Sequence, residues 1–182
     1  VASGPQLISY DLANRERLQT LALGGSDITG LAREDAFLYT MDSSLRLRVI
    51  ELSGPNMVAR GSLAMPNGAG KLFVGNGIAY VAAGNGNTGG FATADVSNPD
   101  GPLLISGVDA NNVEGRTVVA NGSGLAVAVG TLGFGGGGAA LDVLNVSDPT
   151  NTGAFLTRFP MPADPFSVAI GAGIAFVAGG TA

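Results

Sequence analysis

The stretch Lys71–Pro99, KLFVGNGIAYVAAGNGNTGGFATADVSNP, contains the pattern that decides the fold. Two short apolar runs flank Asn76-Gly77, a pair that readily adopts the positive φ angles of a tight hairpin turn. A third apolar run follows a glycine-rich loop and ends at Asp95-Val96-Ser97, where turn residues take over. No part of the stretch has the period of an amphipathic helix. The stretch therefore predicts three consecutive antiparallel strands.

The same arrangement recurs along the whole chain. The first apolar run of each unit starts at Ile28, Lys71, Thr117 and Ser167, which gives a repeat of about 43–50 residues. A fourth apolar run, such as 57–63 or 103–108, closes the unit. Four short strands per repeat predict an all-β fold, a β-propeller of four-stranded antiparallel blades. A β-solenoid or a β-sandwich is the alternative, although solenoid coils usually have a shorter repeat.

Residues 1–182 group into one propeller segment of about four blade equivalents. The predicted units are a half blade, three complete blades and a second half blade, at 7–23, 28–64, 71–108, 116–159 and 166–178. Because the two halves are complementary, either they meet and close a four-bladed ring or the chain is part of a larger propeller. We expect the larger propeller, since larger rings are commoner.

Two motifs resemble the LVIVD-repeat family. In that family a G-x-A-Y-V-A strand leads to an L-x-V-V-D-V-S-D-P strand, and Gly77–Ala82 (GIAYVA) and Phe91–Pro99 (FATADVSNP) are similar to these. Leu141–Pro149 and Gly173–Ala178 look like further copies, with Asn145 where the family usually has Asp. The resemblance implies a propeller found mostly in secreted or cell-surface bacterial and archaeal proteins. It carries no catalytic residue over, because its motif consists of strand and turn residues.

Charge argues against two classes of partner. The net charge is −5 and Lys71 is the single lysine, whereas nucleic acids and anionic membranes attract basic surfaces. Residues 117–141 carry no charge and are long enough to raise a membrane span. Glycines interrupt this stretch repeatedly, so it predicts two strands and a loop instead.

The chain contains neither His nor Cys. This excludes a Ser/His/Asp triad and any metal site built on imidazole or thiolate within it. Gly84–Gly89 (GNGNTG) matches a dinucleotide-binding pattern, but a strand and not a helix follows, so we interpret it as a loop. We expect no cofactor. Calcium remains an alternative, although the acids are sparsely placed for it.

These observations favour a non-catalytic binding or scaffolding propeller, not an enzyme, within a larger secreted or cell-surface protein. Its partner would be an unidentified protein or glycan of the cell envelope, in addition to further blades of the same protein. A carboxylate-based glycan-processing enzyme is one alternative, which paired acids facing one cleft would favour. A purely structural spacer in a surface assembly is the other.

A contact site is expected at the mouth of the central channel. The loops between second and third strands share a face with the crossovers between blades, and both classes are long. Tight hairpins such as Asn76-Gly77 leave little surface on the opposite face. The expected contact residues are Asp27, Lys71, Asp109, Glu114, Arg116 and Asp164. Arg116 is the best anchor because its planar fork pairs with carboxylates; the alternative is that all six are solvated loop charges.

Overall fold

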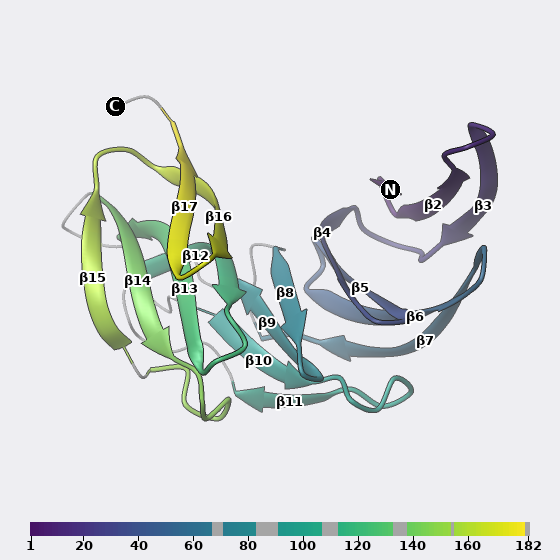
Figure 1. The fold of residues 1–182 in the computed structure, drawn as a ribbon. Helices are drawn as coiled ribbons and strands as arrows, with labels where there is room; N and C mark the ends of the chain where they lie inside the picture. The colour runs from purple at the N-terminus through teal and green to yellow at the C-terminus, as the bar shows by residue number, and fades with distance from the viewer. Residues whose placement is uncertain (67–70, 83–90, 107–112, 133–137, 154, 181–182) are drawn as a thin grey trace.

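The structure is a computed structural model, which describes residues 1–182 except 67–70, 83–90, 107–112, 133–137, 154 and 181–182. The described residues form strands and turns without a helix. Five antiparallel sheets follow one another around an arc, with the N-terminal and C-terminal sheets at its two ends (Figure 1). Three of the sheets have four strands, which confirms the predicted all-β architecture of four-stranded antiparallel blades.

Within every sheet the strands are neighbours in the order of the sequence. The first sheet contains β1 (Ala2–Ser3), β2 (Gln6–Asp11) and β3 (Glu16–Ala22). The second contains β4 (Ile28–Glu34), β5 (Phe37–Asp42), β6 (Arg46–Ser53) and β7 (Asn56–Ala64). The third contains β8 (Leu72–Gly75), β9 (Ile78–Ala82), β10 (Phe91–Asp95) and β11 (Leu103–Ser106). The fourth contains β12 (Val113–Ala120), β13 (Leu125–Leu132), β14 (Ala139–Asn145) and β15 (Phe155–Met161), and the last β16 (Pro165–Gly171) and β17 (Ile174–Gly179).

The hairpin between β8 and β9 forms through its turn chemistry. Asn76 and Gly77 have φ angles of 55° and 72°, the left-handed conformation that a two-residue hairpin requires at both positions. A Cβ atom added to Gly77 would lie 3.2 Å from the Cβ of Ser97, so this position also lets the turn after β10 approach closely. One glycine thereby fixes both the hairpin and the neighbouring turn.

The hairpin between β12 and β13 differs from the sequence-based expectation. Asn-Gly pairs favour tight two-residue turns, but the turn that contains Asn121-Gly122 extends over 121–124. The Asn121 Oδ1 atom accepts hydrogen bonds from the Ser123 amide and hydroxyl, both at 2.9 Å. This side-chain cap stabilises the wider turn in place of a two-residue hairpin. A second difference is the short strand β1, which pairs with β2 through Ala2 and Leu7.

The apolar core is divided among the interfaces between sheets. One cluster between the second and third sheets includes Met41, Val49 and Val81, each fully buried. The next, between the third and fourth sheets, contains Phe91 and Leu144. Two smaller clusters join the end sheets to the rest of the arc. Face-to-face packing of successive sheets is the arrangement that a propeller requires.

The turns that follow the third strand of a repeat join neighbouring sheets. Three of them have a proline whose carbonyl oxygen accepts a hydrogen bond from the preceding sheet. The donors are the Ser9 hydroxyl to Pro55 at 3.5 Å, the Gly61 amide to Pro99 at 2.7 Å and the Thr93 hydroxyl to Pro149 at 2.6 Å. The repeated Ser-x-Pro turns therefore act as contacts between blades as well as strand ends.

The two ends of the arc do not pair with each other. The sheet of β1–β3 and the hairpin of β16 and β17 are separate sheets and lie on opposite arms of the arc (Figure 1). In this structure the chain therefore has the form of an open arc and does not close a four-bladed ring.

Candidate functional site

Three of the six expected contact residues lie together. The Lys71 ammonium donates a hydrogen bond to the Phe166 carbonyl at 2.6 Å, although the two residues are far apart in sequence. The Arg116 guanidinium lies over the Phe166 ring, 5.7 Å from its centroid, and its Nη2 atom is 3.9 Å from the Asp164 Oδ2 atom. Lys71, Arg116, Asp164 and Phe166 are called the Arg116 cluster below. It forms because the inner strands β8, β12 and β16 pack side by side, with Lys71 just before β8, Asp164 just before β16, and Arg116 and Phe166 within the first four residues of β12 and β16.

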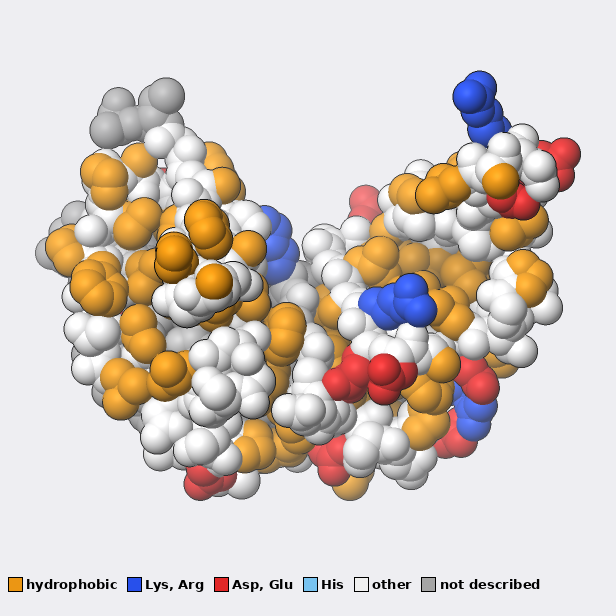
Figure 2. Space-filling model, viewed as in Figure 1, with side chains coloured by type: hydrophobic (Ala, Val, Ile, Leu, Met, Phe, Trp, Pro, Cys, Tyr) orange, Lys and Arg blue, Asp and Glu red, His pale blue; other side chains and the backbone are white. Residues whose placement is uncertain are grey.

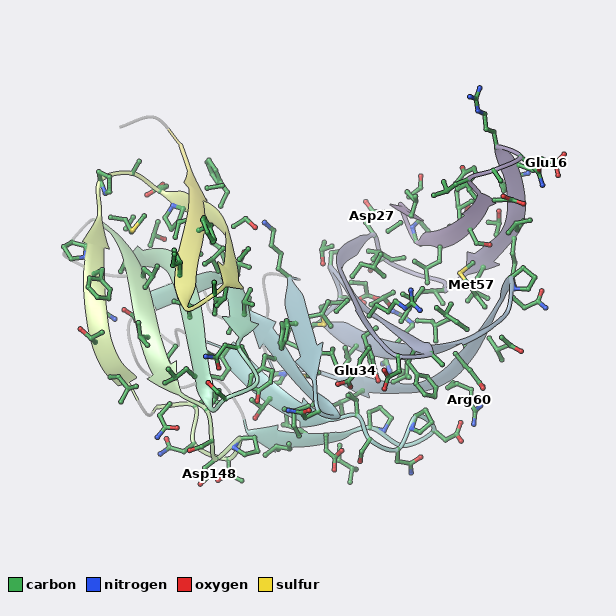
Figure 3. The ribbon with its side chains drawn as sticks, in the orientation of Figure 1. Glu16, Asp27, Glu34, Met57, Arg60 and Asp148 are labelled. Carbon is green, nitrogen blue, oxygen red and sulfur yellow. The ribbon has the colours of Figure 1, made fainter. Side chains whose placement is uncertain are left out.

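Of the other three expected residues, Asp27 does not join this cluster (Figure 3). Asp27 is exposed and lies near the N-terminal sheet, on the other arm of the arc (Figure 3). Glu114 is in β12, opposite Thr131 in the strand register. Asp109 lies outside the described residues.

The Arg116 cluster is open to solvent. The Arg116 and Asp164 side chains are 36% and 57% exposed, and their contact is long. An exposed ion pair of this kind contributes about 0–1 kcal/mol to stability. The guanidinium is therefore held only by weak contacts and remains accessible to an incoming carboxylate.

A cavity lies on the opposite face, among the hairpin turns. We call this cavity of about 560 Å³ the interblade pocket, because it opens between the third and fourth sheets. Its walls come from the ends of β8, β9 and β12, from the turns at 76 and 121–124, and from the turn that contains Ser147 and Pro149. The expectation that this face offers little surface is corrected by the pocket, to which the wide turn at 121–124 contributes four lining residues.

One carboxylate faces this pocket. Glu34, the last residue of β4, reaches across from the second sheet, and its Oε2 atom accepts a hydrogen bond from the Gly77 amide at 3.0 Å (Figure 3). Glu34 is the one acid among the described residues that line the pocket. Sequence reasoning missed it because the two bonded residues are 43 positions apart in the chain.

Aromatic side chains form another part of the wall. Phe73 and Tyr80 are 6.2 Å apart between ring centroids, and Phe91 lies 6.0 Å behind Tyr80. Tyr80 is only 7% exposed, and burial raises the pKa of its hydroxyl, which is therefore neutral at physiological pH. Among the described residues, the Tyr80 hydroxyl has no hydrogen-bond partner. Thr40 Oγ1 is the one fully buried side-chain polar atom without a partner among the described residues, so the Tyr80 hydroxyl oxygen itself is open to solvent and accessible to a ligand in the pocket.

Neither a metal cluster nor a membrane helix is found in the part of the chain that the structure describes. Those residues bring together no three acids that could hold a metal ion, and they form no helix long and apolar enough to cross a bilayer. The chemistry available at the interblade pocket is thus one carboxylate, one phenol, the Asn and Ser side chains of the turns, turn amides and a few apolar side chains.

Known β-propellers share this fold. The β-propeller domain of Cps50 (Swd1) from Myceliophteria thermophila superposes with a TM-score of 0.71 and 12% identity, over 98% of this chain and 58% of that one. BamB from Moraxella catarrhalis superposes with a TM-score of 0.65 and 11% sequence identity, over 98% of this chain and 51% of that one. The computationally designed protein Ika4 superposes with a TM-score of 0.61 and 11% sequence identity, over 86% of this chain and 87% of that one.

These similarities support the fold and nothing more specific, because the identities are low. The chain spans about half the length of the BamB and Swd1 chains. No family model matches the sequence, and no curated protein matches it.

Proposed function

We propose that this chain is a non-catalytic binding or scaffolding module of a larger secreted or cell-surface protein, and that it contacts a protein partner through the interblade pocket. The pocket is the observation that carries the proposal. Its turns are held by three packed sheets, and binding residues are disproportionately found on loops that a rigid scaffold positions. A concave site in which a few polar groups are fixed in place is typical of ligand-binding sites.

The arrangement of acids supports binding more than carboxylate catalysis. Glycoside hydrolases usually place two carboxyl groups on either side of the bond they cleave. Among the described residues lining the interblade pocket, Glu34 stands alone. The Arg116 cluster, on the other face, supplies a cation beside an aromatic ring and is the second candidate contact site.

The test is a binding screen of the immobilised chain against peptide and glycan arrays. Ser123→Trp would fill the pocket from an exposed turn, Arg116→Ala would remove the second site, and Asn14→Trp would place the same large ring on the distant β2–β3 turn. We expect peptide signals that Ser123→Trp abolishes and the other two variants preserve.

Thermal melting of each variant separates a binding defect from misfolding. If binding signals are lost only in Arg116→Ala, the contact site is the Arg116 cluster on the channel face and not the interblade pocket. A screen without any signal that depends on either face contradicts the proposed binding function.

A further inference from the structure

We propose that the interblade pocket accepts the side chain of a lysine from the partner protein, with Glu34 as its counter-ion. This inference rests on the proposed function, because it assumes that the pocket is the contact site, and it adds the chemistry that the pocket recognises.

The Glu34 carboxylate has unused capacity for a cation. The Gly77 amide occupies its Oε2 atom at 3.0 Å, which fixes the carboxylate at the edge of the pocket. No described residue donates a hydrogen bond to the second oxygen. No lysine or arginine is found among the described residues that line the pocket. The nearest basic residue in sequence, Arg33, directs its Nε atom to the Asp35 carbonyl at 3.0 Å.

Tyr80 and Phe73 complete a site for an alkylammonium group. The Tyr80 side chain lines the pocket, is more than nine-tenths buried, and has a hydroxyl without a partner among the described residues. A phenol oxygen can accept a hydrogen bond from an ammonium group. The neighbouring Phe73 ring offers an aromatic face to the cation and an apolar surface to its methylene chain.

The surroundings of the pocket are acidic. Asp35 follows Glu34 directly, Asp148 lies between two lining residues, and Asp95 pairs with the lining residue Ile78. Hydrogen bonds from the Ser97 hydroxyl and amide lower the pKa of Asp95, and those from Thr150 lower the pKa of Asp148, so both are charged at neutral pH. With a net charge of −5 on the chain, this face attracts a basic partner.

The geometry favours lysine over arginine. Arginine binds carboxylates best through two parallel hydrogen bonds, which need both carboxylate oxygens. At Glu34 the Gly77 amide already binds one oxygen, so a bidentate guanidinium would have to share that atom with the amide. Lysine carries a compact charge on a flexible stem and can use a single oxygen, and a cavity of about 560 Å³ has room for this side chain.

The experiment measures steady-state surface plasmon resonance of the chain immobilised at low density. The probes are three blocked tripeptides, acetyl-Gly-X-Gly-amide, in which X is lysine, norleucine or arginine. Norleucine keeps the hydrocarbon stem and removes the charge. We expect the lysine peptide to bind best, more weakly at high salt, and to lose about tenfold in affinity with Glu34→Gln, as for a charge-assisted hydrogen bond.

Glu16→Gln, the same substitution at an exposed site on the far arm of the arc, is the matched control and should leave binding unchanged (Figure 3). Tyr80→Phe should weaken the lysine peptide but not the norleucine peptide. The proposal is overturned if norleucine binds as well as lysine, if Glu16→Gln acts like Glu34→Gln, or if no peptide binds. In each of these cases, array signals that Ser123→Trp abolishes would still support the proposed function.

Discussion

Asp42 shows how a single residue contributes to the fold. Its side chain is fully buried at the end of β5 and forms an ion pair with Arg48. Burial acts to raise its pKa, but hydrogen bonds from the Arg48 guanidinium, the Ser44 hydroxyl and the Arg46 amide oppose this, so the pKa of Asp42 lies below its usual value. The charged form is therefore the one that the folded state stabilises.

A depressed pKa makes this contribution dependent on pH. It is fully present above the pKa of the unfolded chain, about 3.9 for Asp, and is lost as the pH falls through the lower pKa of the folded state. We expect Asp42→Asn to lower the unfolding free energy by about 2 kcal/mol at pH 7, and by less below pH 4. Denaturant unfolding at several pH values measures this.

Asp95→Asn is the control for this prediction. Asn145 occupies the equivalent turn in the next repeat and accepts the same bonds from Ser147, so an amide is compatible with that site. The Asp95→Asn substitution should change the unfolding free energy by no more than about 0.5 kcal/mol. If Asp42→Asn and Asp95→Asn lower the unfolding free energy equally at pH 7, the role assigned to the buried ion pair is contradicted.

At the scale of elements, a close contact between blades occurs where β7 meets the turn after β10. The Gly61 amide donates to the Pro99 carbonyl at 2.7 Å. A Cβ atom at Gly61 would lie 2.6 Å from the Pro102 ring and 2.7 Å from backbone atoms of the same turn. Arg60 beside it pairs with both Asp100 and Glu51.

Gly61→Ala should therefore separate two sheets that otherwise pack closely. We expect Gly61→Ala to lower the unfolding free energy by about 2 kcal/mol, which corresponds to a melting temperature lower by roughly 4–8 °C in a chain of this size. Gly101→Ala is the control, because its nearest neighbour at 3.3 Å is the end of the Asn98 amide, which can move. If calorimetry finds the two variants equally stable, the turn after β10 moves to accommodate a Cβ atom at Gly61, and the close contact does not limit stability.

The strands could be predicted from sequence because their signals are local. Asn76-Gly77 determines its hairpin by its own backbone preferences, and the apolar runs around it set the strand register. The interblade pocket could not be predicted in this way. It depends on Glu34 meeting Gly77 across two sheets and on the Asn121 cap that widens a turn. The Arg116 cluster was foreseen in part, because the starts of inner strands converge wherever blades surround a channel.

At the scale of the whole molecule, the arc leaves apolar surface uncovered at its C-terminal end. Hydrophobic side chains gather on this arm in Figure 2, where Phe166, Ile174 and Phe176 are 50%, 57% and 60% exposed. Exposed apolar patches and open sheet edges promote association. We expect residues 1–182 in isolation to self-associate as concentration rises, which light scattering detects.

The double variant Ile174→Ser/Phe176→Ser should reduce this association. Leu12→Ser/Leu18→Ser, which removes exposed leucines from the opposite arm, serves as a comparison for general loss of hydrophobicity. A monodisperse monomer with a cooperative melt, from the unaltered chain, would contradict the expectation and favour a closed four-bladed ring.

The central structural claim is that the two end sheets do not combine into one blade. In a closed four-bladed ring, β17 would lie beside β2, at the spacing of about 4.8 Å between neighbouring strands. In the arc, β1 pairs with β2 instead, and β17 is on the other arm (Figure 1). Because the chain has no cysteine, Tyr10→Cys on β2 and Ala175→Cys on β17 can carry spin labels at two unique positions.

The decisive measurement is the distance between these labels by pulsed dipolar spectroscopy, with labelled chains diluted in unlabelled ones. The open arc predicts a single long distance, the same at every dilution. A dominant short distance, at the separation of labels on adjacent strands and independent of dilution, would show that the ring closes and would contradict the open arc.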